Sequence, residues 1–188
     1  MEIEEYYSHK KELYDIILKY VDDGNDYNNP SYQNLRKNIE NQKFPENREE
    51  LKEIIRMIIT ISKNHHRYPG FFSKIEKILL SLKDNIKQSF SNTEIFDLFK
   101  NNKLIILFLI QNNIITIDKS IIDLIIKKNE SDKFYCHFFY PEINDEQIKQ
   151  QIESEIINID PNILENFEQK RQIGENDSQI CTLIRNDS

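Results

Sequence analysis

The amino-acid sequence predicts an all-α fold in which an irregular N-terminal helical bundle leads into stacked helix pairs. Three observations support this prediction. Apolar residues recur at spacings of three and four, which is typical of helices that bury one face. Only three glycines and five prolines occur in 188 residues, and they fall between the periodic segments. One short helical pattern also recurs along the chain, as it does in repeat proteins.

Two helices are expected in the first 45 residues. The first runs from Ile3 to Tyr20 with apolar side chains on one face, and Asp22-Asp23-Gly24 ends it. Residues 25–30 are expected to form a polar loop, because asparagine, aspartate and proline favour turns. A shorter helix follows, and its apolar face carries Tyr32, Leu35 and Ile39.

An antiparallel helical hairpin is expected next. Phe44-Pro45 breaks the chain, and Asn47 and Glu50 have the spacing of a capping box, in which each side chain covers a free backbone N–H. The first apolar stripe consists of Leu51, Ile54, Ile55, Ile58 and Ile61. After a turn at Tyr68-Pro69-Gly70, the facing stripe consists of Phe71, Ile75, Ile78, Leu79 and Leu82. Two amphipathic helices joined by a short turn must bury these stripes against each other.

A short helical pattern recurs after residue 90. Its three copies align on Ile95, Ile121 and Ile180, where their apolar positions coincide, and Ser91 with Glu94 forms a capping box before the first. We expect each copy to be a helix that buries the same three positions; the alternative is chance similarity in a chain rich in isoleucine and asparagine. The three helices are expected to begin at Thr93, Lys119 and Ser178.

Other helices are expected between and after these copies. Residues 103–113 form an apolar helix whose last residues, Asn112-Asn113, suit the left-handed conformation that closes a helix. Residues 91–118 are therefore helix, tight turn, helix and extended loop. The sequence leaves open whether Phe134–Tyr140 is a short helix or an extended segment. Two later helices are expected, one over 144–159 with Ile148, Ile152 and Ile156, and one from Asp160-Pro161 to Gly174 with Ile163, Leu164 and Phe167.

Charge and hydropathy narrow the class of partner. The net charge is −7, which argues against nucleic acid because a phosphate-binding protein usually carries a basic face. The longest apolar run, Leu104–Ile110, is far shorter than the roughly 20 residues that span a bilayer. Residues 1–7 carry three glutamates and no basic region, unlike a signal peptide. We therefore expect a cytoplasmic protein that binds neither nucleic acid nor membrane.

No combination of residues predicts a catalytic, cofactor-binding or metal site. His65-His66 are adjacent, so on a helix they point about 100° apart, and we expect them to cap a helix end. Cys136-His137 has no second Cys/His pair at metal-ligand spacing, so Cys136 is expected to be a packed core cysteine, and no disulfide with Cys181 is implied. The acid pairs Glu49-Glu50 and Asp22-Asp23 are expected to lie at helix ends, where the dipole and capping account for them.

Two groups of surface residues allow alternative interpretations. Six tyrosines lie in the N-terminal part: Tyr6, Tyr7, Tyr14, Tyr20, Tyr27 and Tyr32. We expect most of them to be core residues whose hydroxyls reach its rim, the alternative being a protein-binding patch. The basic residues are expected to be solvated surface: Lys10, Lys11, Lys19, Arg36, Lys37 and Lys43.

Part of the chain resembles an ankyrin repeat. The segment Phe99–Asp118, FKNNKLIILFLIQNNIITID, is similar to the second half of an ankyrin unit, although it lacks the TPLH tetrapeptide, the paired alanines and the Gly-His turn. More broadly, the runs HHRYPGFFSKIEKILLSLKDNIKQSFSNTEIFDLF and KRQIGENDSQICTLIRNDS resemble a region of unknown function that precedes ankyrin arrays in large protist protein families. The resemblance implies ankyrin-type repeats that begin near Asn176 and continue past Ser188.

These observations predict the organisation and the function of the chain. We expect an N-terminal bundle over 1–90, divergent ankyrin-like helix pairs over 91–175, and the truncated start of a further repeat over 176–188. The expected function is a protein-interaction or repeat-capping scaffold without catalytic activity or cofactor. The alternative is a structural or oligomerisation domain. The identity of the protein partner and the residues that bind it are not encoded in any recognisable motif.

Overall fold

The structure is a computed structural model that describes residues 3–23, 30–41, 47–64, 70–132 and 135–156. Every regular element within these ranges is a helix, so the predicted all-α class is confirmed for the described part of the chain. The chain divides into two compact units, Met1–Ser91 and Asn92–Ser188, which we call unit 1 and unit 2. Unit 1 contains α1 (Ile3–Asp22), α2 (Pro30–Asn41), α3 (Arg48–Asn64), α4 (Phe71–Ser81) and α5 (Lys83–Ser89). Unit 2 contains α6 (Asn92–Phe99), α7 (Lys103–Gln111), α8 (Lys119–Asn129), α9 (Tyr135–Phe139), the short 3₁₀ helix η2 (Tyr140–Glu142) and α10 (Glu146–Ile156).

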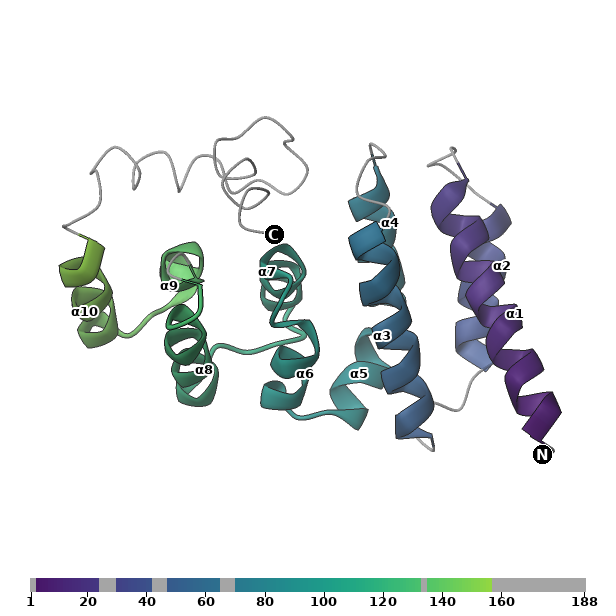
Figure 1. Ribbon diagram of the computed structural model, residues 1–188, viewed down its shortest axis with the longest axis horizontal. Helices are drawn as coiled ribbons and strands as arrows, with labels where there is room; N and C mark the ends of the chain where they lie inside the picture. Colours follow the sequence, from purple (N-terminus) through teal and green to yellow (C-terminus); the bar gives the residue numbers. More distant parts are fainter. Residues whose placement is uncertain (1–2, 24–29, 42–46, 65–69, 133–134, 157–188) are drawn as a thin grey trace. The chain divides into compact units, whose positions relative to one another are not determined.

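Unit 1 consists of two antiparallel helix pairs followed by a short helix. Helix α1 packs against α2 and helix α3 packs against α4, as Figure 1 shows. Helix α4 also contacts α1 and α2, so it joins the two pairs, and α5 packs on α3 and α4. The hairpin predicted for α3 and α4 is therefore confirmed.

The predicted apolar stripes form the core of unit 1. All ten residues assigned to the stripes of α3 and of the following helix are buried. Leu35 and Ile39 of α2 are buried as well, and Leu13, Ile17 and Tyr20 of α1 join them. The helical spacing of these residues is what places them together, because residues three and four apart share one face.

The capping box at the start of α3 takes a modified form. The Asn47 side-chain oxygen accepts the Glu50 backbone N–H at 3.3 Å, as predicted. The Glu50 carboxylate, however, accepts from the Asn47 side-chain amide at 2.9 Å. The side chains of the two residues are thus linked in both directions, and Glu49 and Glu50 lie in the first turn, where the helix dipole favours carboxylates.

The structure contains one helix, α5, that the apolar pattern did not separate from α4. Helix α4 ends at Ser81, Leu82 keeps a near-helical conformation, and α5 begins at Lys83. No glycine or proline marks this break. The apolar spacing also runs through it, since Leu82, at the break, and Ile86 of α5 are both buried. Because the apolar stripe continues and no glycine or proline interrupts it, the sequence gives no sign that the helix axis changes between α4 and α5 (Figure 1).

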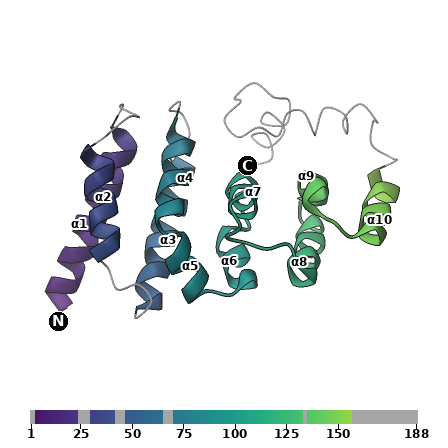
Figure 2. The same cartoon turned by 180° about the vertical axis from the view of Figure 1, so that it is seen from behind.

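Unit 2 consists of helix pairs in two layers. Helix α6 pairs with α7, and α8 pairs with α9. The first helices of the pairs, α6 and α8, contact each other, and so do the second helices, α7 and α9 (Figures 1 and 2). The predicted order of helix, turn, helix and extended loop over 91–118 is confirmed. The segment that the sequence left open contains a helix, α9, followed by η2.

The end of α7 shows how asparagine closes a helix in this chain. Asn113 has a φ of 54°, the left-handed conformation predicted for this position. Its N–H donates to the Ile110 carbonyl at 2.9 Å, and the Ile114 N–H donates to the Leu109 carbonyl at 2.8 Å. These two bonds form a Schellman motif, which satisfies carbonyls that the helix leaves free. The motif turns the chain into the extended loop that leads to α8.

Candidate functional site

The first helices of the two pairs in unit 2 bury the same positions. With Ile95 aligned on Ile121, the buried residues of α6 are Ile95, Phe96 and Phe99, and those of α8 are Ile121, Ile122 and Ile125. Asp97 and Asp123, which follow the second buried residue of each helix, are both exposed. The predicted recurrence is therefore confirmed for these two copies. Helix α8 begins at the expected Lys119 and α6 one residue before the expected Thr93, whereas the third copy, at 177–187, lies outside the described residues.

A side-chain amide links the two pairs at equivalent positions. The Asn92 Oδ1 atom accepts the Thr116 backbone N–H at 3.0 Å, and its Nδ2 atom donates to the Thr116 carbonyl at 2.6 Å. The same Nδ2 donates to Asp118 Oδ2 at 3.0 Å, across 26 residues of sequence. Asn92 thus forms hydrogen bonds with the backbone N–H and C=O of Thr116, just before α8, and with Asp118, which caps α8.

Asp118 is the N-cap of α8. Its Oδ1 accepts from the Ser120 hydroxyl at 2.5 Å and from the Ile121 backbone N–H at 3.0 Å. The Ser120 hydroxyl, then the Asn92 amide and the Ile121 N–H, lower the pKa of the Asp118 carboxyl to about 2. The carboxylate is therefore stabilised in its charged form although the side chain is exposed. We call Asn92, Thr116, Asp118 and Ser120 the polar seam.

The cap of α8 recurs at Asp145, at the start of the helix expected over 144–159, which the alignment of the three copies did not include. Asp145 follows Asp118 by 27 residues, and its Oδ1 accepts the backbone N–H groups of Gln147 and Ile148 at 3.0 and 3.1 Å. Asp118 and Asp145 each cap the residue three positions on, so α10 begins in the same way as α8. The apolar pattern hid this match, because Lys149 stands where α8 has Ile122.

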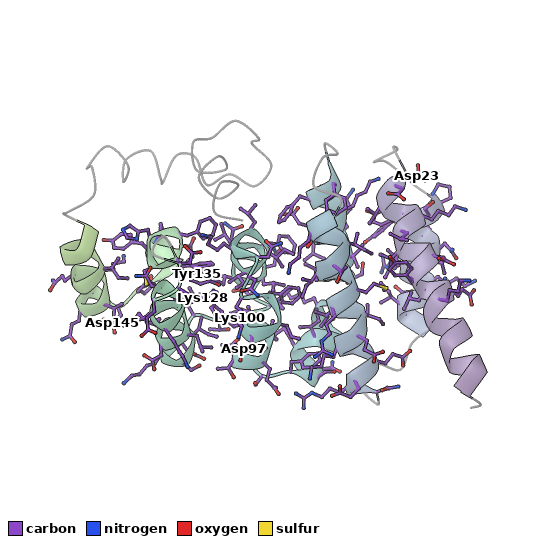
Figure 3. All side chains as sticks on the ribbon, in the orientation of Figure 1. Asp23, Asp97, Lys100, Lys128, Tyr135 and Asp145 are labelled. Carbon is purple, nitrogen blue, oxygen red and sulfur yellow. The ribbon has the colours of Figure 1, made fainter. Side chains whose placement is uncertain are left out.

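A hydrogen bond and an ion pair tie the start of α7 to the start of α9; Tyr135 and Lys100 are labelled in Figure 3. The buried Tyr135 hydroxyl donates to the Lys100 carbonyl at 2.8 Å, and Lys103 Nζ lies 2.7 Å from Asp132 Oδ2. Burial, with a further contribution from the Asp132 carboxylate, raises the pKa of the Tyr135 phenol above its ordinary value. The phenol therefore stays protonated and remains a donor at neutral pH. This link connects the turn before α7 with the start of α9.

Cys136 is a packed core residue, as predicted. It is buried, its Sγ lies 3.7 Å from the Ile125 carbonyl, and its backbone N–H donates to Asn129 Oδ1 at 3.1 Å. His137 is buried beside it in α9. His65-His66 and Cys181 lie outside the described residues. Within the ranges that the structure describes, no group of three or more His, Cys, Asp or Glu side chains is placed to hold a metal ion.

The tyrosines of unit 1 follow the predicted core arrangement where they are described. Tyr20 is buried, its ring centre lies 5.3 Å from that of Tyr32, and the Tyr32 hydroxyl reaches Ser81 Oγ at 3.1 Å. Tyr14 departs from it, with 39 % of its surface exposed. The basic residues of the predicted solvated surface are exposed at Lys11, Lys19, Arg36 and Lys37. The side chains of Tyr6, Tyr7, Tyr27, Lys10 and Lys43 lie outside the described residues.

The interpretation of Asp22-Asp23 needs a correction. The two residues lie at the C-terminal end of α1, where the helix dipole is negative and does not favour carboxylates. The Asp23 carboxylate accepts from the Ser31 hydroxyl at 3.0 Å. The Lys74 ammonium, from α4, donates to backbone carbonyls at the same helix end. Lys74 could not be recognised from the sequence, because a lysine beside an apolar stripe is typical of a solvated helix face.

No protein family, curated protein or solved structure matches the chain in the three comparisons made. Among the described residues, no helix has both the length and the apolar character needed to cross a membrane. The arrangement of the residues therefore carries the functional argument, and the polar seam with its flanking exposed side chains is the candidate site.

Proposed function

We propose that the chain is a protein-interaction or repeat-capping scaffold whose unit 2 is a short, divergent ankyrin-like solenoid. The observation that carries this proposal is the recurrence of one first-helix environment. Residues at matched positions are buried in α6 and α8, and an aspartate caps both α8 and α10. Stacked repeats of this kind present matched surface positions side by side, which is how helical-repeat proteins build binding faces.

The proposed binding face runs along the exposed side of the first helices. Asp97 and Asp123 occupy equivalent exposed positions in α6 and α8, and Gln150 occupies the corresponding position in α10. The Nζ atom of Lys100 lies 3.1 Å from Oδ1 of Asp97, but both side chains are about half exposed, so this ion pair is weak. The face therefore carries both signs of charge, because Lys119 and Lys127 flank Asp123 at a spacing of four on α8, and the partner is a protein surface of complementary mixed charge.

The polar seam and the Tyr135–Lys100 link favour such a role because they hold the pairs in fixed register. A face whose side chains are already positioned loses less conformational entropy on binding. The scaffold proposal therefore requires the links to be formed in the free chain. The proposed function involves no catalytic step, cofactor, nucleic acid or membrane.

Site-specific photo-crosslinking tests the proposed face. A photoreactive amino acid is placed at Asp97 or Asp123 in the full chain, and Lys37, exposed on α2, is the control position. Both first-helix positions should give the same protein adduct in cells that make the chain, Lys37 should not, and Asp97→Lys with Asp123→Lys should remove the adduct. Different adducts at the two positions, or equal labelling from Lys37, would contradict the proposal.

Sedimentation of the full chain separates the scaffold from the oligomerisation alternative. The scaffold proposal expects a sedimentation coefficient that is independent of concentration. A dimer that forms with rising concentration, and that Asp97→Lys with Asp123→Lys disrupts, would assign the same face to self-association.

A further inference from the structure

Lys74 is a buried lysine whose ammonium group lies at the carbonyl end of another helix. Only 1 % of its surface is exposed. Its Nζ donates to the carbonyls of Tyr20 at 3.2 Å and Val21 at 3.0 Å, and to that of Asp23. The same Nζ lies 5.6 Å from the centre of the Tyr20 ring. Lysines usually extend to solvent along an apolar surface, so an ammonium enclosed by carbonyls is a specific arrangement.

The chemistry of this helix end suits a cation. The last carbonyls of an α-helix have no partner within the helix, and the helix dipole makes this end negative. A buried ammonium needs acceptors for its three N–H groups, because an unsatisfied buried charge is strongly unfavourable. Three carbonyls meet this requirement, and the face of an aromatic ring adds a favourable electrostatic contact.

We infer that the carbonyl end of α1 is a binding site for a primary ammonium ion, and that Lys74 fills it as an internal latch that holds α1 on α4. The inference is independent of the proposed partner-binding face in unit 2. Helix α4 contacts both α1 and α2, so the latch acts where the first helix pair meets the second. The carboxylates nearest the site in sequence are Asp22 and Asp23, and the backbone oxygens of Tyr20, Val21 and Asp23 accept from the Lys74 ammonium.

Amide hydrogen exchange in the full chain tests the latch. Lys74→Met keeps most of the side-chain volume and removes the charge, whereas Lys11→Met removes an exposed lysine of α1 as a matched control. The amides of α1 should exchange at least about tenfold faster in Lys74→Met, as expected for the loss of hydrogen bonds from a charged donor. The amides of unit 2, and all amides in Lys11→Met, should be unchanged. Wild-type protection of α1 in Lys74→Met would overturn the inference.

Chemical rescue tests the ammonium specificity. Lys74→Ala removes three carbons and the nitrogen, which is the composition of n-propylammonium. Millimolar n-propylammonium chloride should restore α1 protection in this variant, whereas tetramethylammonium chloride, which has the charge but no N–H donor, should not. Equal effects of the two salts, or of n-propanol, would show that volume or ionic strength, not an ammonium site, is responsible.

A measurement on the wild-type chain keeps the test valid even if both variants fail to fold. With ¹⁵N-labelled lysine, one side-chain ammonium signal should exchange with water at least tenfold more slowly than the others. Scalar coupling across its hydrogen bonds should connect it to carbonyls among Tyr20, Val21 and Asp23. Uniformly fast exchange of all lysine ammonium groups would contradict the latch.

Discussion

The side-chain amide of Asn92 donates to the carboxylate of Asp118 at 3.0 Å, and these residues stand at equivalent positions in two successive helix pairs of unit 2. The bond therefore joins one helix pair of unit 2 to the next, through residues that occupy the same position in each pair. Asp118 therefore has two roles: its carboxylate accepts from Asn92 and also caps α8 by accepting the Ile121 N–H. Local helix formation and the stacking of the pairs are coupled through one side chain.

Removing the Asn92 amide should weaken unit 2. Asn92→Ala loses two bonds to the Thr116 backbone and one to Asp118, and partial exposure limits the cost to about 1–2 kcal/mol of unfolding free energy. Asn92→Asp should cost more, because it places a second carboxylate beside Asp118. Urea denaturation measures both, with Asn101→Ala in the exposed turn as the control. Variants as stable as this control would refute the role of the seam.

Acid should reveal the Asp118 network. Its pKa is lowered from 3.8 to about 2 in the folded chain, so the folded state holds the proton less tightly than the unfolded state does. The stabilisation is therefore complete above about pH 4 and lost as the pH falls towards 2. The difference in unfolding free energy between wild type and Asp118→Asn should shrink over this range. A difference that stays constant from pH 4 to pH 2 would contradict the network.

Tyr135 should respond to alkali in the opposite direction. The folded state raises the pKa of its phenol, so the contribution to stability is present below the ordinary tyrosine pKa of about 10 and is lost as the pH rises beyond it. Tyr135→Phe also leaves the Lys100 carbonyl without this donor, at a cost of about 1 kcal/mol at pH 7. Spectrophotometric titration of the phenols should show one fewer late-titrating group in this variant. Loss of a group that titrates near the ordinary pKa of about 10 instead would show that Tyr135 is accessible.

Equivalent core positions should tolerate the same truncation to the same extent. Ile95→Val and Ile121→Val each remove one methylene from a fully buried side chain, at an expected cost of about 0.5–1.5 kcal/mol. Leu98→Ala and Leu124→Ala, at half-buried positions, should also match each other. Thermal unfolding compares the two pairs of variants. Costs that differ severalfold within a pair would show that the two environments are not alike.

Much of the fold follows from apolar spacing in the sequence. The stripes of α3 and α4 and the three buried positions of α6 and α8 could be predicted, because side chains three and four residues apart must share a face. Local signals also located the left-handed Asn113 and the start of α8. The break at Leu82 could not be predicted, because an apolar residue in register continues the stripe of α4 into α5.

The candidate site was less accessible to sequence reasoning. Asn92 reads as an ordinary helix-start residue until Thr116 and Asp118 are placed beside it, and that placement depends on the packing of α6 on α8. Lys74 is predicted to be a surface residue from the sequence alone, because its contact with the carbonyls at the end of α1 depends on the packing of α1 on α4. In both cases the partner is distant in sequence, so no local pattern records the contact. The match between Asp145 and Asp118 was not recognised, because α10 keeps the cap but not the apolar pattern of α8.

The central claim is that unit 2 is a stack of equivalent helix pairs joined through its polar seam. A double-mutant cycle on Asn92 and Asp118 tests it most directly, using Asn92→Ala, Asp118→Ala and the double variant in the full chain. The account predicts a coupling free energy of about 0.5–1 kcal/mol, because each single variant already removes the bond that they share. Strictly additive losses, with a coupling within error of zero, would show that the two positions do not meet in solution.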